Sequence, residues 1–226
     1  MVCLQSIEEI RMESAKIKRE TLILSSAVVF LSDPILLKLF YYFHLTHLSA
    51  VGMTRIVQTL AILWIVIVFE KNFTSVGLSG KQFFHGITRG VAWSISFAIV
   101  AAIAFGVLKL FKINPFLMFK TRLPFQFHDK VLFFIIGGLV APLAEEVFFR
   151  GVIFGFLRKW GFPFALFMST GIFVSFHILF SGVKYPIAQI VGGFIFAISY
   201  ETEKSLWVPI IIHAAGNMAI FSLSLL

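Results

Sequence analysis

Long apolar segments separated by short polar stretches run through almost the whole chain. Most are long enough to cross a hydrocarbon core of roughly 30 Å as an α-helix, which needs about 20 residues. Backbone polar groups in lipid must be satisfied within the segment, so the pattern predicts an all-α, polytopic transmembrane helical bundle. We expect about seven spans, with a range of six to eight, at about 21–43, 55–70, 88–110, 130–157, 162–180, 185–200 and 206–226.

The composition agrees with a multi-pass integral membrane protein. Of 226 residues, 59% are hydrophobic and 13% are charged, against about 25% charged in a soluble domain. The net charge of +8 comes from Lys and Arg that lie between the apolar segments and form no patch. Such flanking charges meet lipid headgroups or set topology, so we expect the lipid bilayer as a partner and no nucleic acid.

The N-terminal residues differ from the rest of the chain. Residues 1–20 mix acidic, basic and apolar side chains, which predicts an amphipathic surface segment ahead of a single transmembrane domain at 21–226. Four acidic residues in this stretch argue against a signal peptide.

Two polar positions complicate the first two spans. Asp33-Pro34 and Lys38 interrupt the first segment, which indicates either a kink that faces the bundle or a misdrawn span. Arg55 is the first residue of the second segment and is counted with the loop residues. With the N-terminus cytoplasmic, the loops then hold ten basic residues inside and seven outside, which does not decide the orientation.

The fourth segment carries charges that membrane helices normally avoid. Glu145, Glu146 and Arg150 lie in an otherwise apolar run, and each charge costs about 2.5–3.5 kcal/mol on insertion scales. Glu146 and Arg150 are four residues apart and share a helix face, so they can form an ion pair. Glu145 lies about 100° round the helix and is free to point elsewhere. Charges placed in this way indicate a functional site.

Polar side chains on two later segments can reach the same depth. His177 lies on the fifth segment, and His213 and Asn217 share a face of the seventh. Glu145 and His177 are each roughly 24 Å from the turn that joins their segments, at about 1.5 Å per residue. Pro142 lacks an N–H and is expected to kink the fourth helix just before the carboxylates, leaving a carbonyl free.

This set of residues fits more than one kind of chemistry. A carboxylate beside an imidazole can deprotonate a water molecule, and a second histidine beside an amide can stabilise an oxyanion. Two Glu and two His could also form a zinc site, although no HExxH motif is present. The same residues could instead be buried struts and interhelical hydrogen bonds, or the proton relay of a proton-coupled transporter.

Three motifs resemble the signature of the CPBP family, which includes the type II CAAX prenyl endopeptidases and the bacterial Abi-type membrane proteins. The family pattern E-E-x-x-x-R is matched from Glu145 to Arg150, F-x-x-x-H from Phe173 to His177, and H-x-x-x-N from His213 to Asn217. The resemblance covers about residues 75–226, which we take as the catalytic core.

The resemblance implies an intramembrane endopeptidase of the glutamate type that needs no metal cofactor. Carried over by position, Glu145 is the general base and His177 helps it to activate water. His213 and Asn217 lie on the oxyanion side, and Glu146 and Arg150 support the site. The implied substrate is a membrane-embedded or lipidated protein or peptide, cut near its C-terminus. Without an added soluble domain, the chain is more similar to bacterial members than to eukaryotic ones. A non-catalytic membrane scaffold or immunity protein is the alternative.

Overall fold

The computed structural model describes residues 17–180, 182–183 and 185–225. Residues 1–16, most of the expected amphipathic segment, lie outside the described part. Within it the chain is helical and contains no strand, so the predicted all-α class is confirmed. The long helices are α2 (Arg19–Tyr42), α3 (His47–Glu70), α4 (Phe83–Leu110), a composite helix (Phe127–Trp160), α9 (Phe162–Phe180), α10 (Ile187–Glu203) and α11 (Trp207–Leu223).

Each predicted segment corresponds to one of these long helices. Among the described residues, five helical stretches are long and apolar enough to cross a membrane: Arg19–Tyr42, His47–Glu70, Gly80–Leu110, Phe127–Trp160 and Phe162–Phe180. Trp207–Leu223 is a shorter apolar helix, and α10 has 17 residues. The protein is therefore a multi-pass integral membrane protein.

The composite helix changes its hydrogen-bonding pattern along its length. It runs through α6 (Phe127–Ile135), a π-helical segment η3 (Ile136–Val140), α7 (Ala141–Glu146), a second π-helical segment η4 (Val147–Phe154), α8 (Gly155–Leu157) and a 3₁₀ turn η5 (Arg158–Trp160). Such π segments are rare and occur frequently at functional sites. Here they lie directly before and after the α7 helix, which ends in Glu145 and Glu146.

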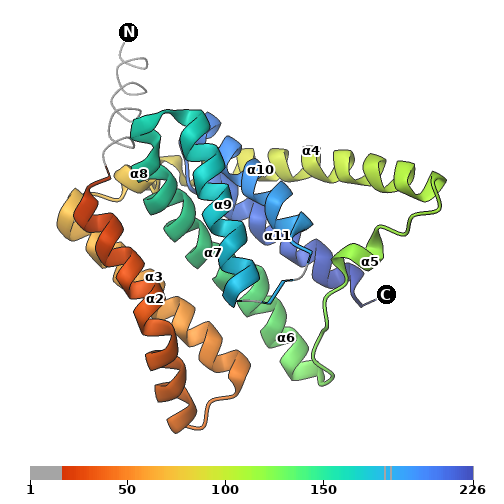
Figure 1. The fold of residues 1–226 in the computed structure, drawn as a ribbon, viewed down its shortest axis with the longest axis horizontal. Coiled ribbons are helices and arrows are strands. Elements are labelled where there is room, and N and C mark those ends of the chain that lie inside the picture. The colour runs from red at the N-terminus through yellow and green to blue at the C-terminus, as the bar shows by residue number, and fades with distance from the viewer. Residues whose placement is uncertain (1–16, 181, 184, 226) are drawn as a thin grey trace.

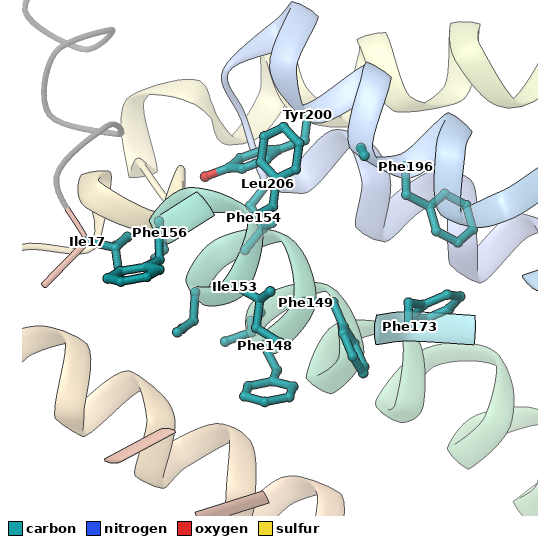
Figure 2. Packing of buried hydrophobic residues seen from close by; sticks show 14 of the residues in the cluster. Ile17, Phe148, Phe149, Ile153, Phe154, Phe156, Phe173, Phe196, Tyr200 and Leu206 are labelled. Atoms are coloured by element: carbon teal, nitrogen blue, oxygen red, sulfur yellow. The ribbon is translucent and has the colours of Figure 1, made fainter. Parts of the chain in front are cut away.

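The composite helix lies at the centre of the bundle. α7 and η4 pack against α2 and α3 on one side and against α9, α10 and α11 on the other (Figure 1). η4 carries large side chains that are almost fully buried, among them Phe148, Phe149 and Phe154 (Figure 2). Phe149 meets Phe173 of α9 edge-on, with ring centroids 5.1 Å apart. This core fixes the helix that carries the two glutamates.

The helical hairpin of α2 and α3 corrects one expectation. α3 begins at His47, so Arg55 lies inside a membrane helix and not in a loop. α2 continues through Pro34, and Asp33 points to α3, where it pairs with Arg55 at 3.1 Å. Of the two alternatives for the polar break in the first segment, the misdrawn span is excluded, because α2 is continuous and Asp33 faces the neighbouring helix. The sequence alone did not place Arg55 within a helix, because its ion-pair partner Asp33 lies on a different helix.

Candidate active site

Glu146 and Arg150 form a fully buried ion pair. Both side chains are 0% exposed, and Arg150 Nη1 donates to Glu146 Oε1 at 3.2 Å. Arg150 Nη2 also donates to the Gly193 carbonyl at 3.2 Å, and its guanidinium lies 4.5 Å from the centre of the Phe173 ring. The i, i+4 pairing predicted from the sequence is present. The pair is enclosed, so a substrate in the site would not contact it.

His213 is bound to this ion pair from α11. Its Nδ1 lies 2.8 Å from Glu146 Oε1, and its ring stacks on Phe196 with a centroid distance of 4.5 Å and an interplanar angle of 19°. Glu146 Oε1 also accepts from Arg150, so in the contact with His213 the carboxylate is the acceptor and His213 Nδ1 carries the hydrogen. The Nε2 lone pair of His213 therefore faces away from Glu146.

Glu145 points to a different place and faces both histidines. Its Oε2 atom lies 3.6 Å from His177 Nε2 and 3.8 Å from His213 Nε2. These separations are too long for hydrogen bonds, and Glu145 Oε2 has no hydrogen-bond partner among the described residues. Contacts of this length raise the question of a bridging water. The structure thus brings Glu145, His177 and His213 together, as their predicted depths require.

The orientation of His177 is fixed by its own helix. His177 Nδ1 lies 2.9 Å from the Phe173 carbonyl, one turn earlier on α9. A carbonyl can only accept, so Nδ1 carries the hydrogen and the lone pair of neutral His177 is on Nε2. Phe173 also packs against the imidazole, with ring centroids 4.4 Å apart. Three acceptor atoms therefore meet in one place, a set that suits a water molecule that donates both hydrogens.

Pro142 and the η3 segment explain the position of Asn217. Ala141 N–H bonds to Ile136 O, five residues back. In the same π register the Gly137 carbonyl would accept from residue 142, which is proline and has no N–H. Asn217 Nδ2 donates to that carbonyl instead, at 2.8 Å. The backbone carbonyl that Pro142 leaves without a backbone donor is therefore that of Gly137, and it accepts a hydrogen bond from Asn217.

A small cavity lies beside Glu145 on the side of α2 and α3. It measures about 20 Å³, enough for a water molecule. Its polar lining comes from Glu145 and from Arg55, Gln58 and Thr59 of α3. Sequence reasoning missed these α3 residues as part of the site, although Arg55 and Gln58 are polar positions beside a long apolar run. The pairing of α3 with α7 has no signature in the sequence.

No arrangement that would hold a metal ion stands out in the part of the chain that the structure describes. No group of three or more His, Cys, Asp or Glu side chains there has ligand geometry.

Comparison with known proteins finds a family model that matches the part of the chain containing the glutamates and histidines. Residues 126–219 match the family model described as type II CAAX prenyl endopeptidase Rce1-like. A Bacillus subtilis (strain 168) protein provisionally named membrane peptidase YdiL is 28% identical over 176 residues, which cover 75% of this chain and 70% of the relative. The membrane-embedded CAAX protease MroQ of Staphylococcus aureus (strain USA300) is 36% identical over 93 residues, or 38% of this chain and 36% of MroQ.

No solved structure matches the chain significantly. The family match contains all six residues of the cluster, and it supports a membrane protease together with the names of both relatives. Residues 126–219 are therefore similar to Rce1-like type II CAAX prenyl endopeptidases, and the resemblance stated from the sequence is confirmed over this part of the chain.

Proposed function

We propose that the chain is an intramembrane endopeptidase of the glutamate type. The observation that carries the proposal is the meeting of Glu145 Oε2 with His177 Nε2 at 3.6 Å and His213 Nε2 at 3.8 Å. The opposite nitrogen of each ring donates to a fixed acceptor. A water held by these atoms has a base for its proton and lies beside a buried, preorganised polar environment.

In the proposed reaction, Glu145 and His177 take one proton from the water as its oxygen attacks the scissile carbonyl. The tetrahedral intermediate then collapses, the C–N bond breaks, and the same proton goes to the leaving amine. No bond forms between the protein and the substrate. Glu146 and Arg150 hold His213 and the helix in place and take no part in the proton transfer.

The hydrogen-bond donors on the oxyanion side depend on where His213 and Asn217 carry their hydrogens. Neutral His213 has no hydrogen on Nε2, because its hydrogen is on Nδ1 and faces Glu146. We therefore propose that the proton taken from the water passes from Glu145 to His213 Nε2, which lies 3.8 Å away, and that His213 then donates this proton to the oxyanion before it reaches the leaving amine, with Glu146 as the counter-charge. Asn217 uses one Nδ2 hydrogen for Gly137 and has one left for the oxyanion.

We further propose that no metal takes part in the reaction. We also propose a single transmembrane domain at 21–226, in which the catalytic core extends over about residues 75–226. The proposed substrate is a membrane-embedded or lipidated protein or peptide, cut near its hydrophobic or lipidated C-terminus. This follows from the membrane setting of the site and from the CAAX protease family and relative.

The proposal is tested with purified protein in detergent and a synthetic peptide with a hydrophobic C-terminus. We expect the wild type to cleave it, and Glu145→Gln to lose at least about 100-fold in kcat/KM, because general-base catalysis contributes about 10²–10⁴-fold. The melting temperature should stay the same, since Glu145 Oε2 has no hydrogen bond to lose.

Full proteolysis by Glu145→Gln would refute the glutamate mechanism. A biological activity that persists while neither form cleaves peptides would favour a scaffold or immunity protein. Proton-coupled uptake of a solute that depends on Glu145 would favour a transporter.

A further inference from the structure

A second group of polar side chains lies inside the membrane helices, between α2 and α3. Arg55 Nη1 and Nη2 donate to the two carboxylate oxygens of Asp33 at 3.1 and 3.3 Å. Arg55 Nη1 also donates to Gln58 Oε1 at 2.6 Å, and Gln58 Nε2 donates back to Asp33 Oδ1 at 2.9 Å. Asp33, Arg55 and Gln58 thus form a closed ring of hydrogen bonds, outside the residues that match the family model.

This ring faces the proposed catalytic glutamate. Arg55 and Gln58 line the cavity of about 20 Å³ that also contains Glu145. Arg55 differs from Arg150, the arginine that supports the glutamates. The Arg150 side chain is 0% exposed, whereas the Arg55 side chain is 20% exposed. Charges within membrane helices are expensive and usually mark functional sites, so Arg55 needs an explanation beyond packing.

The donors of Arg55 are only partly used. A guanidinium has five N–H groups. Two of them reach Asp33 and one reaches Gln58, which occupies the edge formed by Nη1 and Nη2. The edge formed by Nε and the second Nη2 hydrogen has no partner among the residues that the structure describes. This free edge has the geometry that binds a carboxylate through two parallel hydrogen bonds.

We propose that Arg55 binds the C-terminal carboxylate of the substrate. The inference rests on the proposed endopeptidase function and specifies which chemical group the site recognises. A peptide that is cut near its end brings a negative charge into a medium of low dielectric constant, where it needs a cation. An oxygen of this carboxylate takes the place of the water that the cavity can hold.

The position of Arg55 also limits where the cut falls. Arg55 and Glu145 line one small cavity, and an extended residue spans about 3.3 Å. Only a few residues can therefore separate the scissile bond from the carboxylate. Asp33 holds Arg55 in place from the far edge and balances its charge while no substrate is bound.

A purely structural role for the same ion pair is the competing explanation. In that case Asp33 and Arg55 only tie α2 to α3, and the loss of either partner has the same effect on cleavage. Carboxylate recognition makes the two partners unequal. Arg55→Gln removes the binding group, whereas Asp33→Asn removes a competing negative charge and keeps an Oδ1 oxygen that accepts from Arg55.

The test uses two synthetic peptides of the same apolar sequence, one ending in a free carboxylate and the other in a carboxamide. The measured quantity is the ratio of their kcat/KM values for each variant. For the wild type we expect a preference for the carboxylate of about 10- to 100-fold, as for a hydrogen bond to a charged group. Arg55→Gln should bring the ratio close to one, and Asp33→Asn should keep or increase it.

Arg55→Lys keeps the positive charge but lacks the forked edge, so its ratio of kcat/KM values should lie between those of the wild type and Arg55→Gln. If Arg55→Gln does not fold, Arg55→Lys is used in its place. Equal cleavage of both peptides by the wild type would overturn the inference and leave the endopeptidase standing. An equal loss of preference in Asp33→Asn and Arg55→Gln would show that the pair is structural. Cleavage of neither peptide would overturn the endopeptidase, and the inference with it.

Discussion

Glu145 and Glu146 are neighbours in the chain, but their side chains meet different partners. Glu146 is enclosed and binds Arg150 and His213. Glu145 is partly exposed and faces two histidine nitrogens across distances of 3.6 and 3.8 Å. Successive residues of a helix point about 100° apart, which separates the support from the proposed base within a single turn. The sequence was sufficient to predict this division.

The buried pair leads to a prediction about stability. Arg150→Ala leaves the Glu146 charge buried without its ion pair, so we expect a loss of about 3–5 kcal/mol and a clearly lower melting temperature in detergent. The matched control is Arg89→Ala, which breaks a more exposed pair with Glu203. Glu203 keeps its hydrogen bond from Trp93 Nε1 in this variant, so the loss should be smaller than for Arg150→Ala. If both variants melt alike, Arg150 does not have the supporting role described here.

The composite helix shows how one proline organises the site. Pro142 cannot donate to the Gly137 carbonyl in the π register, and Asn217 from α11 donates to it instead. This bond ties α11, which carries His213, to the helix that carries both glutamates. Hydrophobic periodicity could not predict it, because the pattern of apolar residues does not reveal a single turn with a wider hydrogen-bond ring.

A double-mutant cycle tests this link between the two helices. Asn217→Ala should destabilise the protein by about 1–3 kcal/mol, because it leaves a partly buried carbonyl in a membrane helix unsatisfied. In a Pro142→Ala background the loss should be smaller, since the substituted residue supplies the missing backbone N–H. Thermal unfolding of the four proteins gives the coupling energy. Strictly additive effects would show that Asn217 and Pro142 act independently.

At the scale of the whole molecule, the sequence predicted the helices better than their contacts. Length and hydropathy located the long helices of the described residues, and the spacing of Glu145 and His177 predicted their similar depth, with His213 within reach. The ring of Asp33, Arg55 and Gln58 was missed, because its members come from two helices with no fixed spacing. The contact of His213 with Glu146 was missed too, since it depends on how α11 packs against α7.

The absence of a metal requirement is a prediction for the whole protein. We expect active protein to contain no stoichiometric zinc and to keep full activity after extended treatment with a chelator, because a carboxylate and an imidazole can take the proton from water. Elemental analysis alongside the peptide assay measures this. Zinc at one per chain, with activity lost on removal and restored on addition, would make Glu145, His177 and His213 its ligands.

The direct attack of water is tested most sharply by isotope labelling. Peptide is cleaved in a single turnover in water enriched in ¹⁸O, and mass spectrometry is applied both to the product and to the fragment of the protein that contains Glu145. We expect one ¹⁸O atom in the new carboxylate of the product and none in Glu145, because the water oxygen attacks the substrate itself. Transfer of ¹⁸O into the Glu145 side chain would show that Glu145 forms a covalent bond to the substrate, and would contradict the mechanism.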